Sequence, residues 1–269
     1  MAMRLEDRAV IALSGAEARG FLQGLITNDV ERLAPGKALY AALLTPQGKI
    51  LFDFLIVEGD GALLLDCAAD SRDALLKRLL TYRLRAKVGI EARDQLVVLA
   101  GLPDPKAGIS FIDPRLAALG HRTIGARAEM PAADDGAAQH RVQRLDLGVP
   151  EGADFGGDRM FALDAGLDEL HAISFDKGCY VGQELTARMK HRGIARKRLL
   201  PVQSLDGSAL PGSDTPLNAD GREIAEITTT YGSRGFALVR LDRLEEAGSA
   251  AIDAGGVNVG VIKPSWLFA

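Results

Sequence analysis

Short apolar runs separated by glycine and proline turns dominate the first hundred residues. The runs that read as strands are 5–13, 38–45, 50–57, 62–67, 88–92 and 95–100. The second, third and fourth of them are joined only by the turns 46–49 and 59–61. Apolar runs joined by such short turns predict an antiparallel meander.

Three helices are predicted around these strands. Ser14 and Glu17 have the spacing of a capping box, which would open a short helix at the end of the first strand. Asp70 and Asp73 precede leucines at helical spacing, so a second helix should end near Tyr82–Arg83. A third helix is expected over 139–147, closed by Gly148.

The remaining chain changes character twice. From Gly101 onward it is rich in proline and glycine, so it reads as loop, and 128–138 is expected to be a mobile surface loop. A strand at 173–175 would deliver Cys179. Beyond Gly193 the expected strands of a small barrel or sandwich are 199–203, 223–231, 235–241 and 257–262. We expect the boundary between the N-terminal part and this β-rich C-terminal part near Ala195.

Composition narrows the class of protein. The chain has 269 residues, 47% of them hydrophobic, and a net charge of -4. This charge gives no global attraction to nucleic acid or an anionic membrane, so any anion binding must be local. The start has no apolar leader and no run is long enough to span a membrane, which predicts a cytosolic protein, or a mitochondrial-matrix protein in a eukaryote, with no membrane partner.

The two cysteines exclude a disulfide framework and a CxxC metal site. Cys67 ends an apolar run and reads as a buried strand thiol. Cys179 stands between Gly178 and Gly182, two residues after Lys177 and before an expected helix. Those are the surroundings of a reactive thiolate, with Lys177 as its positive neighbour. The alternative is a small apolar residue in a tight strand-to-helix turn.

The segment Lys177–Glu184 reads KGCYVGQE and is followed by LTAR and KHRG. It resembles the YgfZ family, relatives of the folate-binding T-protein of glycine cleavage that are implicated in folate-dependent assembly or repair of iron–sulfur clusters. Segments 21–30 and 44–50 also resemble motifs shared by YgfZ and T-proteins. The resemblance implies an α+β, T-protein-like multi-lobed architecture: a folate-binding core over 1–195, made of two interleaved lobes with the second at roughly 40–100, a central folate pocket, and a C-terminal β-barrel over 196–269.

Asp53 is the first candidate for that pocket. Strand alternation places it on one face with Leu51, Leu55 and Val57, where a carboxylate must be paired or face a polar cavity. The alternative is an edge-strand carboxylate that reaches solvent. T-proteins typically have two adjacent acids where this chain has Phe52–Asp53, and they lack the motif cysteine. This difference puts ordinary aminomethyl transfer in doubt.

The resemblance implies further folate contacts. Asp146 matches a folate-contacting carboxylate of T-proteins and would accept the N–H pair of the pterin; the alternative is an exposed helix acid that balances Arg141 and Arg144. The other implied contacts are Asn28, Gln183, Glu184 and Arg188. The basic strip 188–198 would hold the glutamate tail of folate, or be a solvated helix, or contact phosphates.

The residues and the resemblance lead to two hypotheses, one for an accessory protein and one for an enzyme. The first is a tetrahydrofolate-binding accessory protein of iron–sulfur cluster assembly or repair, with Cys179, Lys177 and Asp53 as the chemical groups and with assembly factors or cluster-containing client enzymes as partners. The second is a tetrahydrofolate-dependent aminomethyl or one-carbon transferase, with Asp53 near the reacting amine. Direct RNA binding ranks behind both. The scattered histidines predict no metal site within the chain, so Cys179 would supply at most one ligand to a cluster.

Overall fold

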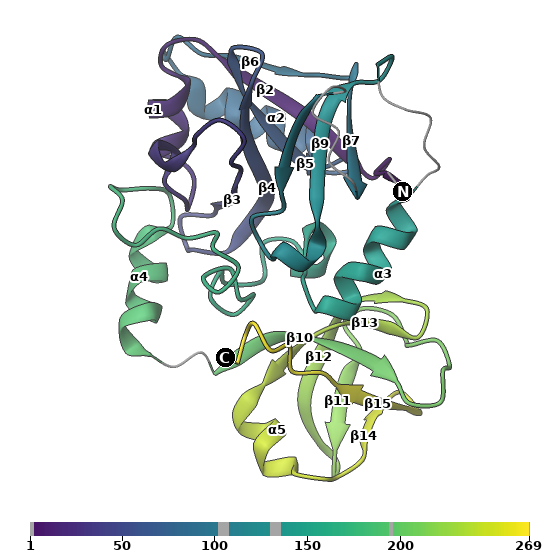
Figure 1. Ribbon diagram of the computed structural model, residues 1–269. Coiled ribbons are helices and arrows are strands. Elements are labelled where there is room, and N and C mark those ends of the chain that lie inside the picture. The colour runs from purple at the N-terminus through teal and green to yellow at the C-terminus, as the bar shows by residue number, and fades with distance from the viewer. Residues whose placement is uncertain (1–2, 102–107, 130–135, 194–195, 269) are drawn as a thin grey trace.

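The computed structural model of the chain describes residues 3–101, 108–129, 136–193 and 196–268. Two sheets and their helices form the N-terminal part, and a barrel forms the C-terminal part below them (Figure 1). This α+β architecture with a C-terminal β-barrel confirms the fold class expected from the sequence.

The first sheet has five strands in the order β3-β4-β5-β2-β6, all antiparallel to their neighbours. Their bounds are β2 Arg8–Ser14, β3 Leu39–Leu44, β4 Ile50–Gly59, β5 Ala62–Ala68 and β6 Gly89–Ala92. The predicted meander is therefore confirmed as β3–β4–β5. Two helices, α1 (Ala18–Gln23) and α2 (Arg72–Arg83), bury Leu22, Leu75 and Leu79 against Phe54 and Ile56 on one face of this sheet.

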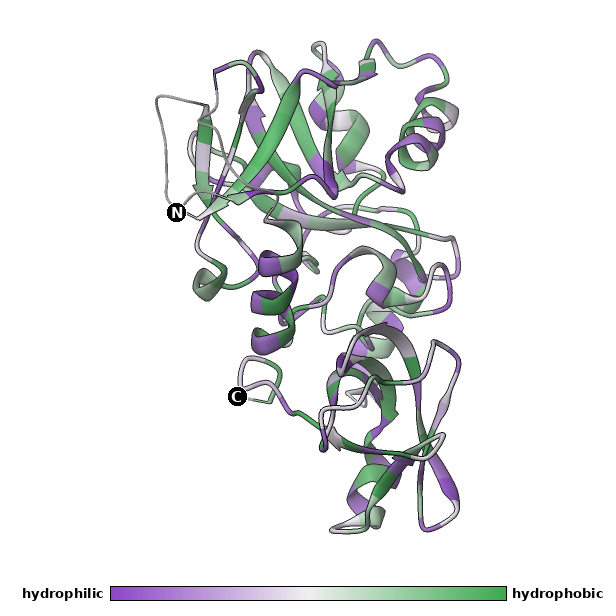
Figure 2. Cartoon of the chain, turned by 90° about the vertical axis from the view of Figure 1, so that its right-hand side faces the viewer, coloured by the Kyte–Doolittle hydropathy of each residue, from purple (hydrophilic) through white to green (hydrophobic). Residues whose placement is uncertain are grey.

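The second sheet has the order β1-β7-β9-β8 and faces the other side of the first sheet. Its strands are β1 Met3–Arg4, β7 Leu96–Gly101, β8 Ile109–Ile112 and β9 His121–Ala126. Val98 and Ile124 share a core with Leu55 and Val57 of β4. Residues 40–100 are thus divided between the two sheets rather than forming one lobe. Figure 2 shows largely hydrophobic strands in this part of the molecule.

Several local expectations differ from the structure. The stretch after Gly101 that reads as loop contains β8 and β9, because strands this short give a weak periodic signal. The capping box is wrong: α1 begins at Ala18, and Glu17 instead accepts a hydrogen bond from the backbone N–H of Lys87. Residues 173–175 are not a strand. Residues 130–135 of the expected mobile loop lie outside the described residues.

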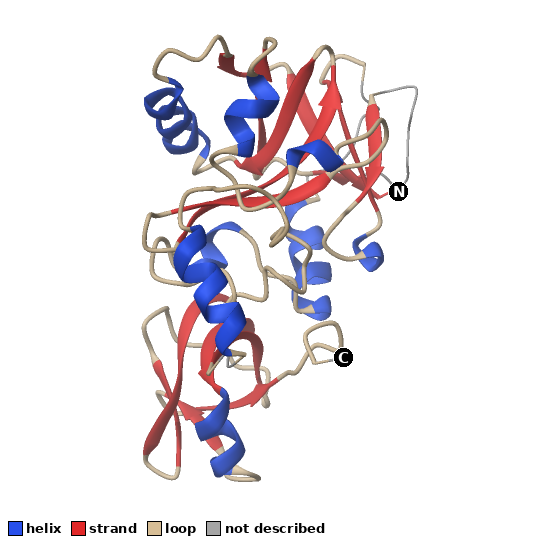
Figure 3. Ribbon diagram, turned by 90° about the vertical axis from the view of Figure 1, so that its left-hand side faces the viewer, coloured by secondary structure: helices blue, strands red, loops and turns tan. Residues whose placement is uncertain are grey.

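The predicted third helix is confirmed as α3 (Ala137–Leu147). It ends where Gly148 takes the left-handed conformation with φ of 70°, which favours glycine. Between α3 and the barrel lie the 3-10 turn η3 (Gly152–Phe155) and α4 (Gln183–Arg192). Figure 3 shows that the helices lie on the outside of the N-terminal sheets.

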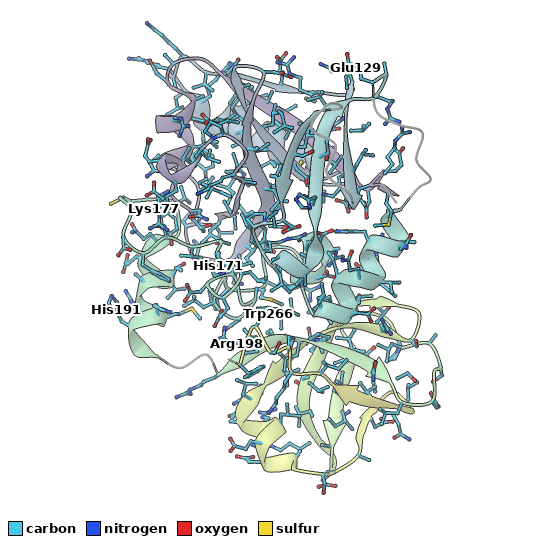
Figure 4. The ribbon with its side chains drawn as sticks, in the orientation of Figure 1. Glu129, His171, Lys177, His191, Arg198 and Trp266 are labelled. Carbon is cyan, nitrogen blue, oxygen red and sulfur yellow. The ribbon has the colours of Figure 1, made fainter. Side chains whose placement is uncertain are left out.

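The C-terminal part is a closed barrel with the order β10-β13-β12-β11-β14-β15. Its elements are β10 Lys197–Ser204, β11 Pro216–Ala219, β12 Arg222–Tyr231, β13 Arg234–Arg240, α5 Leu241–Ala247, β14 Ile252–Ala254 and β15 Val257–Val261. The short strands β11 and β14 were not predicted from the sequence. Leu199 and Phe236 join the core of the N-terminal part, and Trp266 donates from Nε1 to the Leu147 carbonyl at 2.8 Å, so the barrel is docked firmly (Figure 4). No helix within the described ranges is both long and apolar enough to cross a membrane.

Candidate functional site

Asp53 lies at a hollow of about 360 Å³ between β4 and η3. The predicted alternation is confirmed, because Leu55 and Val57 line the core between the sheets while Phe54 and Ile56 face the helices. Asp53 is only 5% exposed. Its lining partners are Ile50, Leu51, Phe52, Asp70, Ser71, Ala74, Gly152, Ala153, Phe155 and Gly157. The carboxylate therefore faces a cavity and not open solvent.

The carboxyl group of Asp53 is held from two sides. The backbone N–H of Gly152 donates to Oδ1 at 2.9 Å, and the Tyr40 hydroxyl donates to Oδ2 at 3.1 Å. Burial raises the pKa of Asp53, and the nearby Arg8 guanidinium opposes this shift. A fixed, desolvated carboxyl group of this kind can accept from, or donate to, a polar ring that enters the hollow.

A second hollow of about 260 Å³ adjoins the first and shares Asp70, Gly152 and Ala153 with it. Its walls carry three arginines and three acids among Asp7, Arg8, Ala68, Ala69, Asp70, Arg141, Arg144, Glu151, Gly152, Ala153 and Tyr231. Arg8 and Arg144 are buried, and the Arg141 guanidinium lies over the Tyr231 ring at 4.7 Å. The two hollows therefore adjoin, with the Asp53 carboxyl group in the first and both guanidinium and carboxylate groups in the second.

A buried ion network reaches the second hollow at Glu151. Arg122 donates to Asp66 at 2.7 Å and to Asp113 at 3.0 Å, and Arg115 donates to Asp113 at 2.8 Å and to Glu151 at 2.6 Å. All five side chains are at most 8% exposed. Asp113 and Glu151 have pKa values held below their usual range: burial opposes this, but the neighbouring guanidinium groups outweigh it.

The network continues to the barrel through η3. Arg144 contacts Glu151 and Asp154, each at 3.0 Å. Asp154 also accepts from Thr229 at 2.6 Å and from the Tyr231 hydroxyl at 3.1 Å, both on β12. The segment Glu151–Phe155 lines both hollows and is hydrogen-bonded to the barrel through Asp154. Sequence reasoning missed this network because its members are dispersed; the one available signal was Asp66, an acid inside an apolar run.

Lys177 anchors the segment that precedes η1 (Val30–Arg32). Its Nζ donates to the carbonyls of Gln23, Ile26 and Asn28 at 2.7, 2.8 and 2.8 Å, and burial lowers the pKa of Lys177 to about 8. An ammonium group has three N–H donors, so all are used by the backbone. The sequence-based role of Lys177 as a chemical partner of Cys179 therefore gives way to a structural role.

Asn28 is also occupied by the fold. Its Nδ2 donates to the carbonyls of Tyr40 at 2.7 Å and His171 at 2.8 Å, while its Oδ1 accepts from the N–H of Asp29 at 2.8 Å. Asn28 thus joins β3 to the chain before Lys177, and it does not line either hollow. The expected folate contact from Asn28 is replaced by this backbone joint.

Several residues of the KGCYVGQE motif pack against the fold. Gly182 has a φ of 83°, and a Cβ there would lie 2.6 Å from the Thr45 carbonyl, so only glycine fits against the β3–β4 turn. Tyr180 is buried in the main core. Cys179, by contrast, is exposed, and α4 begins only at Gln183. The expected helix does follow Cys179, and the exposure of the thiol argues against the alternative of a packed apolar residue; its reactivity stays a prediction.

The remaining candidates lie away from the hollows. Glu184 and Arg188 form the expected ion pair on the exposed side of α4, and Gln183 opens that helix. In the basic strip, Lys190 pairs with Asp168 and Arg198 pairs with Glu169. Asp146 pairs with Arg234 of β13 and lines only a small separate cleft of about 60 Å³. Neither hollow at Asp53 is lined by any of the other candidates Cys179, Asp146, Gln183, Glu184 and Arg188. Figure 4 shows Lys177 beside α4 at the edge of the molecule.

Comparison with known proteins places the chain in a family. The human "Iron-sulfur cluster assembly factor IBA57, mitochondrial" is 34% identical over an alignment that covers 90% of this chain and 78% of the human protein. The mouse protein of the same name is 32% identical with the same coverage. The chain belongs to the IBA57 family. Residues 196–269 match the family described as "CAF17, C-terminal beta-barrel domain".

This chain shares its fold with an aminomethyltransferase T. The crystal structure of the glycine cleavage system aminomethyltransferase T from Bartonella henselae superposes with a TM-score of 0.75, covering 98% of this chain and 85% of the other, at 15% identity. This likeness shows the fold alone. It agrees broadly with the YgfZ and T-protein resemblance read from the sequence. Within the described residues no group of three His, Cys, Asp or Glu side chains is arranged to hold a metal ion.

Proposed function

We propose that the protein is a tetrahydrofolate-binding accessory factor of iron–sulfur cluster assembly or repair, with Cys179 as its functional thiol. Family membership supports the role in cluster assembly. The observation that carries the role of the thiol is the contrast within one motif: Lys177, Tyr180 and Gly182 each have a packing contact, whereas Cys179 is exposed. An exposed thiol is available to a partner or a cluster.

The two adjoining hollows fit a reduced folate. Their volumes of about 360 and 260 Å³ suit a ligand of drug size. The pterin ring carries an amidine-like pair of N–H donors, and the fixed carboxyl group of Asp53 can accept from both of them. In the second hollow, Nη1 of Arg8 lies 3.8 Å from a carboxylate oxygen of Glu151, and Nη2 of Arg144 donates no hydrogen bond to another described residue. These are the two groups that a glutamate carboxylate would contact. This position for the tail replaces the strip on α4, where several cations already have partners.

We expect Asp53→Asn to weaken tetrahydrofolate binding by about 1–3 kcal/mol, because the ring loses a charged or proton-sharing partner. Titration calorimetry with tetrahydrofolate measures the effect. Asp146→Asn is the matched control: it removes an acid outside both hollows, so its affinity should equal that of the wild type. Equal losses in both variants, or no binding heat from the wild type at millimolar ligand, would contradict the placement or the ligand.

Thermal melts separate a binding role of Asp53 from a structural one. A ligand that binds the folded state raises the melting temperature, and at a fixed concentration the rise grows with the logarithm of its affinity. If Asp53→Asn loses this rise while the ligand-free melt changes little, Asp53 binds the ligand. A large loss of ligand-free stability with an unchanged rise would make Asp53 only a support for Gly152 and Tyr40.

The second function, a folate-dependent aminomethyl or one-carbon transferase, draws support from Asp53 beside the hollow and from the T-protein fold. It is disfavoured because Phe52 stands where T-proteins have a second acid. Formation of methylenetetrahydrofolate from an aminomethyl donor would distinguish the two. The partners proposed here are assembly factors or cluster-containing client enzymes. The relatives named above are mitochondrial, which favours the matrix for a eukaryotic chain; a cytosolic location stays a prediction.

A further inference from the structure

The outer face of α2 and the turn that follows it form an unpartnered surface. Leu75 and Leu79 point into the core beneath the helix. On the outside, Leu80 is 39% exposed and Leu84 is 88% exposed. Figure 1 shows α2 behind the five-stranded sheet, at the end of the molecule away from the barrel. The first hollow touches only the N-terminal end of α2, at Ser71 and Ala74, so Leu80 and Leu84 line neither hollow.

The backbone at Leu84 holds this leucine outward in an unfavourable conformation. Its φ is 45° and its ψ is -105°, a combination that suits glycine and is strained for a residue with a Cβ. A strained residue usually persists because its side chain packs or because it acts on a partner. Leu84 does not pack within the described structure, so its side chain is placed for contact with another molecule.

The same surface is strongly basic. No acid occurs between Asp73 and Glu91, although the chain as a whole has a net charge of -4. Five cations lie in that interval, and none of them forms an ion pair with the residues that the structure describes: Lys77, Arg78, Arg83, Arg85 and Lys87. The Glu17 carboxylate accepts a hydrogen bond from the backbone N–H of Lys87 and not from its ammonium group. These charges are free to pair with another molecule.

We propose that this surface, the α2 patch, docks an acidic surface of a partner protein that has an apolar pocket for Leu84. Unpaired cations around a central apolar side chain complement a pocket with an acidic rim. Nucleic acid would leave the two leucines unburied. A membrane-surface helix carries a long stripe of large apolar residues, whereas this patch offers only Leu80 and Leu84. The inference does not depend on folate binding or on Cys179.

Site-specific cross-linking in the native cell tests the proposal. A photoreactive amino acid at position 84 should trap a protein, and mass spectrometry of the adduct should find an acidic peptide at the contact. The matched position is Val142, which is 50% exposed on α3 and lies outside the patch. Arg83→Glu with Arg85→Glu should reduce the adduct by about tenfold, because reversed charges repel an acidic rim.

Leu84→Gly separates docking from folding. Glycine relieves the backbone strain, so the variant should melt no lower than the wild type, yet its affinity for the trapped partner should fall by about tenfold with the loss of one buried leucine. The proposal is overturned by three results: no adduct above that at position 142, adducts indifferent to charge reversal, or the same dependence seen instead for binding to vesicles of phosphatidylcholine with phosphatidylserine.

Discussion

Arg122→Leu should lower the free energy of unfolding by about 3–5 kcal/mol. The Arg122 side chain is 1% exposed and contacts both Asp66 and Asp113. Its removal leaves buried carboxylates with an incomplete set of cations, and an uncompensated buried charge costs far more than the pair contributes. Denaturation in urea, followed by far-ultraviolet circular dichroism, measures the change.

Arg234→Leu is the matched control, because Arg234 is also an arginine in an ion pair but is 39% exposed, opposite a half-exposed Asp146. Exposed pairs contribute about 0–1 kcal/mol, so this variant should remain close to the wild type. Similar losses in the two variants would contradict the view that burial makes the network sensitive.

The same network should make the fold labile in acid. The Arg144 and Arg115 guanidinium groups keep the pKa of Glu151 well below its usual value despite burial, and burial lowers the pKa of His140 to about 3. In the unfolded chain a glutamate takes up its proton near pH 4.3 and a histidine near pH 6.5. Below these pH values the unfolded chain therefore binds more protons than the folded chain. Stability should therefore fall as the pH falls below about 6.5.

Cys179 should react with iodoacetamide at least about 100-fold faster than Cys67 at neutral pH, because access and thiolate content both govern alkylation. Cys179 is exposed, whereas Cys67 is 1% exposed, and burial raises the pKa of the Cys67 thiol to about 12. Mass spectrometry of peptides after timed alkylation measures both rates in one sample, so Cys67 is the internal control. Similar rates would mean that Cys179 is shielded in solution.

The sequence predicted the elements whose pattern is regular over several turns or alternations. The meander β3–β4–β5 and the helices α2 and α3 follow from apolar spacing and from glycine turns, whereas for the C-terminal part this pattern predicted a barrel or a sandwich and the family resemblance implied the barrel. The alternation along β4 also placed Asp53 on the inner face, which the structure confirms. Local pattern was sufficient in these cases because each element buries one face.

Sequence reasoning failed where contacts between distant residues decide the role of a side chain. Lys177 looked like the partner of a neighbouring thiol, but its contacts are carbonyls about 150 residues earlier in the chain. Two further ion pairs, Asp146 with Arg234 and Arg115 with Glu151, also join residues that are far apart in the sequence. No spacing rule reports such contacts, and the fold alone creates them.

The activity of cluster-dependent enzymes in cells whose only copy of this protein carries Cys179→Ala tests the central claim most directly. The account predicts that this variant accumulates and melts like the wild type, since Cys179 is exposed, yet leaves those enzymes as inactive as in cells without the protein. Cys67→Ala, matched in chemistry but buried, should retain activity in proportion to the amount of folded protein. Normal enzyme activity with Cys179→Ala would contradict the claim that this thiol carries the function.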